Sequence, residues 1–222
     1  MPPRIKLDFF YDIGSPYSYL AFEILLRYEQ LWNLDLQLQP VLLGGVFKLT
    51  GNSSPAATQY KRAHMMNDIS RVSQEFQIPF SPGPEFPGNT MQTMKMLRYL
   101  KDELSPAKFK EATRHYFKEN FQVGTALSSP DFVASLPTDI LPAADMEVAL
   151  VKSKEKRISE LMKAESTNLV ETHGAFGFPW MVVHRSDGEV ACYFGSDRFA
   201  NMAWWLGPEY HWMGPVPVKS NL

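Results

Sequence analysis

The chain has 222 residues, of which 45% are hydrophobic and 21% charged, proportions that exclude wholesale disorder and a disulfide-stapled mini-protein. Its 22 Lys and Arg are balanced by 24 Asp and Glu, giving a formal net charge of -2. The sequence therefore lacks the basic excess that is typical of nucleic-acid-binding proteins. No apolar run approaches the roughly 18 residues of a membrane span, and residues 1–6 lack the apolar core of a secretory signal.

The first 40 residues predict two parallel strands joined by a helix. Residues 5–11 and 34–40 alternate between apolar and polar side chains, which is typical of strands. Between them, Ser15 and Pro16 suit the start of a helix. Apolar residues continue at helical spacing as far as Trp32, and Asn33 is the expected stop. A strand–helix–strand unit of this kind favours parallel strands.

Helical patterns separated by prolines fill residues 58–173, and a short β region follows. The expected helices begin near Asn67 or Asp68, at Asn89, Ser105, Ser129 and Lys152, and the last ends at Gly174. Strands are expected at 180–184 and 190–194, followed by a helix capped by Ser196 and ended by Gly207.

This element order predicts an α/β fold: a thioredoxin-like domain with an all-helical domain inserted after the second strand. We assign residues 1–56 and 174–222 to the first domain and 57–173 to the second.

The Ser15-Pro16-Tyr17-Ser18 segment lies between the first strand and the first helix. Thioredoxin-fold oxidoreductases carry C-P-x-C at this junction, where the helix N-terminus stabilises a thiolate. Serine cannot exchange disulfides, but its hydroxyl can donate a hydrogen bond to a thiolate that a ligand brings. The simpler interpretation is that Ser15 only caps the helix.

Two further segments support a ligand site. Pro179 directly precedes the third expected strand, where thioredoxin-like folds carry a cis-proline that turns the preceding backbone groups outward; an ordinary strand-start proline is the alternative. Ser196 and Asp197 precede the last helix, where Asp197 can pair with a ligand's ammonium group while N–H groups at the same helix end bind a carboxylate. The alternative is that both residues merely cap the helix.

The single cysteine, Cys192, excludes an intrachain disulfide, a C-x-x-C motif and a zinc site of paired cysteines. Its place in an alternating strand predicts a buried structural thiol. The five histidines show no metal-ligand spacing, so no metal is expected.

Together these residues resemble the kappa-class glutathione transferases, a family whose fold the 2-hydroxychromene-2-carboxylate isomerases share. The matching segments occur in the family's order at residues 10–12, 15–18, 51–52, 67–68, 77–79, 174–179, 194–198 and 212–215. The resemblance implies glutathione as co-substrate and a homodimer.

At the thiol end, the resemblance implies that Ser15 stabilises the glutathione thiolate while Pro16 and Tyr17 line the site. Phe178, followed by Pro179, would pair its backbone with the cysteinyl part. The family more often has leucine at position 178, so the ring is expected to narrow the electrophile pocket. Gly14 stands where a larger apolar residue is common, which suggests a looser turn before Ser15.

At the two ends of glutathione, the same resemblance implies that Asn52 and Lys61 contact the glycine carboxylate. Ser196 and Asp197 would hold the γ-glutamyl group, and Arg198 would reach across the dimer.

Three functions follow as hypotheses. The first is a transferase whose thiolate attacks electrophiles or peroxides, with a glutathione peroxidase side activity and a role in detoxification. The second is a glutathione-dependent isomerase, and the third is a non-catalytic adaptor that binds glutathione or a protein. The family occurs in mitochondria and peroxisomes, and residues 220–222 are a weak variant of the peroxisomal tripeptide; the cytosol also stays open.

Overall fold

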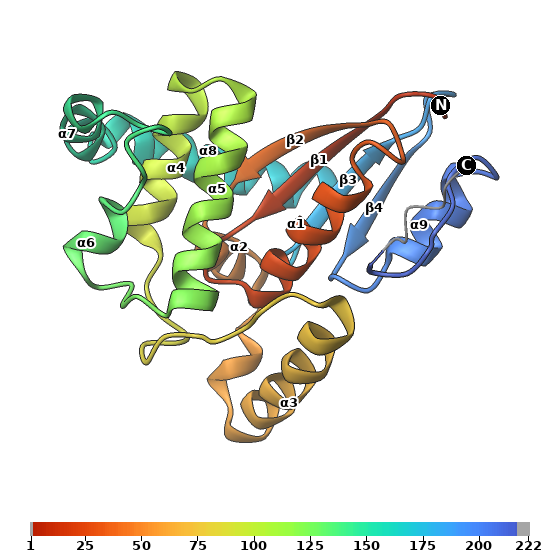
Figure 1. Cartoon of the computed structure of the whole chain (residues 1–222), viewed down its shortest axis with the longest axis horizontal. Helices are drawn as coiled ribbons and strands as arrows, with labels where there is room; N and C mark the ends of the chain where they lie inside the picture. The colour runs from red at the N-terminus through yellow and green to blue at the C-terminus, as the bar shows by residue number, and fades with distance from the viewer. Residues whose placement is uncertain (1, 217–222) are drawn as a thin grey trace.

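A computed structural model of the chain describes residues 2–216 and contains a four-stranded mixed sheet with the order β2-β1-β3-β4 (Figure 1). The strands span Ile5–Tyr11, Leu34–Pro40, Trp180–His184 and Val190–Phe194, as predicted. β1 and β2 are parallel, whereas β3 runs antiparallel to both β1 and β4. β4 is therefore an edge strand.

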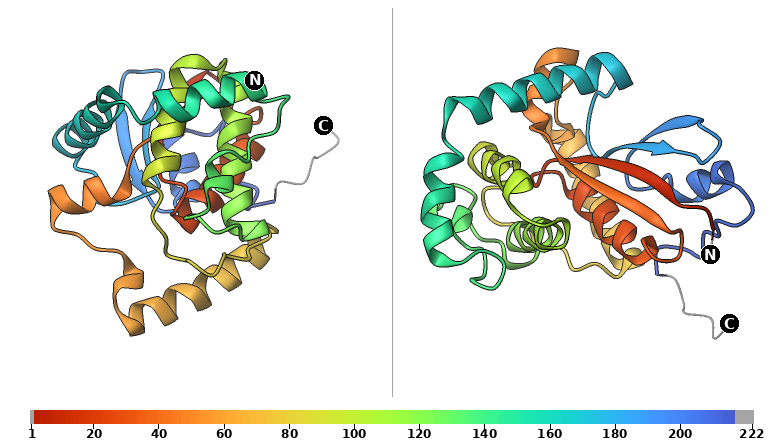
Figure 2. Two further views of the ribbon diagram at one scale, coloured as in Figure 1. Left: turned by 90° about the vertical axis from the view of Figure 1, so that its left-hand side faces the viewer. Right: turned by 90° about the horizontal axis from the view of Figure 1, so that it is seen from above.

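Helices cover both faces of this sheet (Figure 2). α1 (Pro16–Tyr28) and α9 (Phe199–Leu206) share the larger buried cluster with Leu7, Met181 and Tyr193 on one face. On the other face α2 (Leu43–Thr50) and α8 (Lys156–His173) pack around Trp180 and Val182 in a smaller cluster. The carboxyl end of β1 and the start of α1 meet between these layers.

The segment between α2 and α8 is helical, as predicted. It contains α3 (Gln59–Phe76), α4 (Met91–Glu103), α5 (Pro106–Lys118), α6 (Pro130–Val133) and α7 (Ala143–Lys152), with a 3-10 turn at Pro55–Ala57 and a π-helical turn at Glu119–Val123. Figure 1 shows α3 set apart from α4–α8, on the other side of α1's first turn.

Several predicted element boundaries are wrong. α1 ends at Tyr28, because the chain turns before Asn33, whose φ is 49°. α3 begins at Gln59, well before Asn67 and Asp68, and α8 begins at Lys156 after the separate helix α7. α2 was not expected. Ser196 does not cap the last helix, since α9 starts at Phe199 with Arg198 at its N-cap position.

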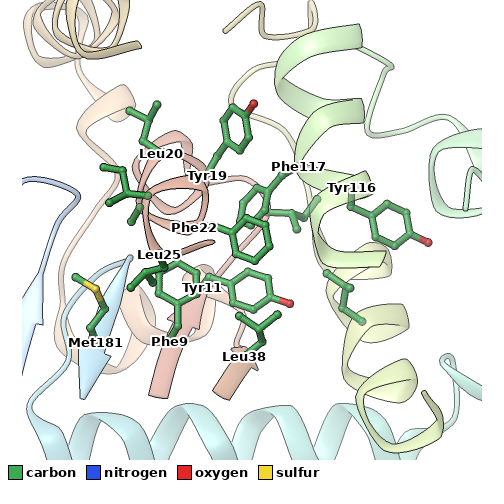
Figure 3. Packing of buried hydrophobic residues seen from close by; sticks show 14 of the residues in the cluster. Phe9, Tyr11, Tyr19, Leu20, Phe22, Leu25, Leu38, Tyr116, Phe117 and Met181 are labelled. Atoms are coloured by element: carbon green, nitrogen blue, oxygen red, sulfur yellow. The ribbon is translucent and has the colours of Figure 1, made fainter. Parts of the chain in front are cut away.

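The core joins the sheet to the helical segment through aromatic side chains. Figure 3 shows Tyr11, Phe22 and Phe117 pointing toward one another; the Tyr11–Phe117 and Phe22–Phe117 ring centroids lie 5.5 and 5.4 Å apart. The buried Tyr11 hydroxyl makes a 2.8 Å hydrogen bond with the Thr113 hydroxyl. β1 and α5 therefore share one interior, which fixes the helical segment against the end of β1.

Candidate functional site

A cavity of about 720 Å³ opens where the first turn of α1, the loop before β3, the start of α9 and the helix α3 converge. Eight of the ten predicted site residues line it: Ser15, Pro16, Tyr17, Asn52, Lys61, Phe178, Ser196 and Asp197. Pro179 does not line the cavity but follows Phe178 in the chain. Arg198 does not line the cavity. The volume falls within the usual range for small-molecule sites.

Ser15 lines this cavity as the N-cap residue of α1. Its Oγ accepts a hydrogen bond from the Ser18 amide at 3.2 Å, and its hydroxyl donates to the Phe178 carbonyl at 3.2 Å. Pro16 has no amide hydrogen, and within residues 2–216 the Tyr17 amide has no hydrogen-bond partner. A hydroxyl and an amide donor at a helix N-terminus together suit an anion.

Pro179 follows a cis peptide bond, as predicted. The Pro179 carbonyl accepts from the Gly195 amide at 3.1 Å, which links this loop to the segment before α9. The Phe178 amide has no partner within the part of the chain that the structure describes. The Phe178 ring is 5% exposed and packs in the smaller cluster with Val46 and Leu169, so it takes up little of the cavity, contrary to our expectation.

The turn before Ser15 is tight rather than loose. Asp12 is buried, and its carboxylate accepts from the Gly14 amide at 2.9 Å, from the Leu43 amide at 2.8 Å and from the Thr90 hydroxyl. A Cβ at Gly14 would lie 2.8 Å from Thr90 Cγ2. Burial raises the pKa of Asp12, and its hydrogen bonds oppose this. Asp12 thereby holds the starts of α1 and α2 together beneath the cavity.

Asn52 and Lys61 both line the cavity. Asn52 follows Gly51, which ends α2 with a φ of 70°, and its side-chain amide donates to the Phe176 carbonyl at 2.7 Å. Lys61 is exposed on the first turn of α3. An amide and an ammonium group that line the same cavity suit a carboxylate ligand.

Ser196 and Asp197, just after β4, also line the cavity. Ser196 is buried, whereas the Asp197 carboxylate is exposed and its Oδ2 lies 3.3 Å from Arg198 Nη2. A carboxylate here suits an ammonium group.

Tyr17, in the first turn of α1, is hydrogen-bonded to α3 within the cavity lining. Its hydroxyl donates to Asp68 Oδ2, on α3, at 2.8 Å. Burial, followed by the hydrogen bond and charge of Asp68, raises the pKa of Tyr17. The phenol therefore remains a neutral donor at physiological pH. Asp68 was missed as a site residue because its segment was predicted to start a helix. The signal that could have identified it is the match of residues 67–68 to the family pattern.

The apolar lining was also missed. It comes from Met65, Val72 and Phe76 on α3, Phe86 and Pro87 before α4, Phe199 on α9, and Trp212 and Pro215 in the C-terminal segment. No periodicity in the sequence relates these segments, which only the tertiary fold brings together.

Cys192 is exposed, contrary to the prediction of a buried thiol. Cys192 lies on the edge strand β4, where it pairs with Val182 of β3. This position is beyond the part of the sheet that α2 and α8 cover. Partial burial still raises the pKa of the Cys192 thiol.

No helix in residues 2–216 meets the length and apolarity of a membrane span, and the same residues contain no group of three or more metal-ligating His, Cys, Asp or Glu side chains.

Comparison with known proteins supports the predicted family. Residues 6–206 match the family described as DSBA-like thioredoxin domain. The chain is 37% identical to glutathione S-transferase kappa 1 of Rattus norvegicus and 32% identical to that of Homo sapiens; each alignment covers 99% of this chain and 97% of the relative.

Solved structures confirm the fold class. A 2-hydroxychromene-2-carboxylate isomerase superposes with a TM-score of 0.74 at 20% identity, over 90% of this chain and 94% of that one. The cytosolic disulfide reductase DsbM from Pseudomonas aeruginosa, solved with GSH, gives 0.60 at 15% identity, over 85% and 89%. With identity above 30% along nearly its whole length, this chain belongs to the kappa-class glutathione S-transferase family.

Proposed function

We propose that the protein is a glutathione transferase that holds the glutathione sulfur as a thiolate between the Ser15 hydroxyl and the Tyr17 amide. The observation that carries this proposal is the position of the Ser15 hydroxyl, which caps α1 and faces the cavity of about 720 Å³. Phe178 lines the same cavity, and its amide has no hydrogen-bond partner within residues 2–216. The names of its relatives support glutathione as the co-substrate.

Binding proceeds in this proposal by an exchange of hydrogen bonds. The cysteinyl backbone of glutathione pairs with the Phe178 amide and carbonyl in the manner of an added strand. The Ser15 hydroxyl, which donates to that carbonyl in the free protein, then turns toward the sulfur. Asn52 and Lys61 receive the glycine carboxylate, and Asp197 receives the γ-glutamyl ammonium group.

The chemical step follows from the lowered thiol pKa. Free thiols ionise near pH 8.5, and a helix N-terminus with a hydroxyl donor favours the thiolate. The thiol proton leaves to solvent. The thiolate then forms a bond to an electrophilic carbon, whose leaving group departs with the bonding electron pair. With a peroxide the thiolate sulfur instead bonds to one peroxide oxygen, and the other oxygen departs with the O–O bonding electrons as an alkoxide that takes a proton from solvent. The thiol of a second glutathione then displaces water from the resulting sulfenic acid and forms glutathione disulfide.

Product analysis tests this function against its alternatives. We expect a conjugate, with glutathione consumed, on incubation with an electrophile, and glutathione disulfide with a peroxide. An isomerase would return glutathione unchanged, and an adaptor would bind it without turnover. Ser15→Ala is expected to lower turnover at least tenfold with a smaller effect on glutathione binding.

Ser18→Ala is the matched control. Ser18 is buried in the same helix turn, but its Oγ has no hydrogen-bond partner within residues 2–216. Its removal should leave turnover nearly unchanged. Equal activity of wild type, Ser15→Ala and Ser18→Ala would contradict the role of Ser15 and assign thiolate stabilisation to the backbone.

The proposed assembly is a homodimer. The resemblance supports it, as do the exposed apolar side chains of Val190 and Phe194 on the edge strand β4 and of Phe176, whose ring packs on Phe194; each is at least 41% exposed. Sedimentation equilibrium should give twice the mass of the chain; a monomer at micromolar concentration would contradict the dimer.

The proposed location is the mitochondrion or the peroxisome, again by resemblance. Residues 220–222 lie outside the described residues, so the tripeptide is best tested in cells. Imaging of an N-terminally tagged chain with and without these three residues would show whether they direct it to peroxisomes.

A further inference from the structure

The C-terminal segment, residues 207–216, is held against α1 by side-chain contacts rather than by a helix or strand of its own. The Tyr28 hydroxyl, at the end of α1, donates to the Gly214 carbonyl at 2.6 Å. The Trp212 ring stacks on the Tyr28 ring with centroids 5.0 Å apart. Trp212 and Pro215 line the cavity, so this segment forms part of the cavity wall.

Arg27, the residue before Tyr28, joins the C-terminal segment to the end of α3. Its Nη1 donates to the carbonyls of Phe76 and Pro215 at 2.6 Å each, and its Nη2 donates to the Gln77 carbonyl at 3.3 Å. Phe76 is the last residue of α3, and both Phe76 and Pro215 line the cavity, whereas Arg27 does not. One guanidinium group outside the cavity therefore holds two parts of its wall together.

The chemistry of Arg27 suits a donor that serves several carbonyls. Within residues 2–216 it makes no ion pair, whereas Arg114 binds the buried Glu23 carboxylate with two hydrogen bonds. Burial lowers the pKa of Arg27, but a guanidinium group stays charged in proteins. Hydrogen bonds from a charged donor are stronger than neutral ones, and the planar fork reaches several acceptors at once. A lysine at this position would offer one ammonium group in place of the fork.

We propose that Arg27 is a positioning residue, which fixes the spacing between the end of α3 and the C-terminal segment and so the width of the cavity between Phe76 and Pro215. The inference rests on the proposed glutathione site, where this side of the cavity is left for a group bonded to the sulfur because the two ends of glutathione are assigned to other lining residues. Without the guanidinium group, the Phe76 and Pro215 carbonyls lose their common donor, and the two parts of the wall are no longer tied to each other. A group carried on the sulfur then loses contacts, while the thiolate donors at the start of α1 stay in place.

The test compares the binding of glutathione with that of S-hexylglutathione, which adds an apolar chain to the sulfur. Calorimetry on the intact protein gives both Kd values, and the ratio of the glutathione Kd to the S-hexylglutathione Kd isolates the contribution of the chain. Arg27→Met keeps an apolar stem but removes every donor, so this ratio should fall about three- to tenfold, with the Kd of glutathione within about twofold of wild type. Arg27→Lys keeps the charge and one donor group, and its ratio should lie between those of wild type and Arg27→Met.

Two further variants separate positioning from stability, which urea unfolding measures. Arg114→Met removes the other guanidinium group that binds α1, through Glu23, but Arg114 does not line or tie the cavity wall. It should cost stability and leave the ratio unchanged. Tyr28→Phe keeps the ring that stacks on Trp212 but removes the hydroxyl that anchors the C-terminal segment. Its ratio should fall as well, and by a smaller factor when Arg27→Met is already present, because both side chains hold the same segment.

The outcomes distinguish this inference from the proposed function. An unchanged ratio in both Arg27→Met and Tyr28→Phe would overturn the inference while leaving glutathione binding in place. An equal fall in Arg27→Met and Arg114→Met would also overturn it, because the effect would then follow lost stability. If Arg27→Met does not fold, Arg27→Lys and Tyr28→Phe decide the same question. A wild type that binds neither glutathione nor S-hexylglutathione would overturn the proposed function as well.

Discussion

Gly14→Ala tests how tightly the turn before Ser15 is packed. The added Cβ would lie 2.8 Å from Thr90 Cγ2 and 3.4 Å from Asp12 Oδ1. Carbon atoms prefer about 3.5–4.0 Å, and Thr90 cannot rotate freely because its hydroxyl bonds the buried Asp12 carboxylate. Overpacking of this kind costs about 1–3 kcal/mol. For a chain of this size that corresponds to a fall in Tm of roughly 2–12 °C.

A double-mutant cycle isolates the clash. Thr90→Ser removes the methyl group but keeps the hydroxyl, so it should recover most of the stability lost in Gly14→Ala, with a coupling free energy of about 1–2 kcal/mol. Urea unfolding measures the stability, and the KM for glutathione reports the position of Ser15. Gly44→Ala is the control, since no atom lies within 4 Å of its added Cβ. The reasoning would be refuted if Gly14→Ala were as stable as Gly44→Ala, or if Thr90→Ser did not restore the stability lost in Gly14→Ala.

Three further predictions concern titratable groups. Asp68→Asn should lower the pKa of Tyr17, because it removes a charge and an acceptor that favour the neutral phenol; tyrosinate absorbance, with Tyr17→Phe to assign it, would show no shift if the pair did not form. Lys61→Ala should raise the KM for glutathione about three- to tenfold, less at high salt, whereas the exposed Lys163→Ala should not. Cys192 should react with a thiol reagent in the folded protein but more slowly than a free thiol at neutral pH, since partial burial raises its pKa; a protected thiol would contradict its exposure.

Local patterns were enough to predict the sheet. The strands at 5–11, 34–40, 180–184 and 190–194 alternate clearly, and serine or proline residues mark the starts of α1, α5 and α6. α3 was misplaced because its first turns are polar: Met65 is its first buried residue, so the apolar spacing becomes visible only near Ile69. The short helix α2 has one buried residue, Val46, and two consecutive glycines, Gly44 and Gly45, in its first turn, where glycine's low helix propensity hid the element.

The residues of the candidate site also fall into those that local sequence could predict and those that only tertiary packing places. Ser15, Phe178 and Pro179 lie in short motifs whose backbone geometry follows from the local sequence and the fold class. Asp68 and Trp212 reach the cavity only through the packing of α3 and the C-terminal segment against α1. For Cys192, alternation identified the strand, but which part of the sheet face is covered depends on α2 and α8.

The pH titration of bound glutathione tests the central claim most directly. Thiolate absorbance of the saturated complex should give a thiol pKa at least one unit below the ordinary value of about 8.5. Ser15→Ala removes one hydrogen bond to a charged sulfur, about 1.5–3 kcal/mol, and should raise that pKa by about one to two units. Ser18→Ala should leave it unchanged. A bound thiol with an ordinary pKa, or one that Ser15→Ala does not shift, would contradict the account.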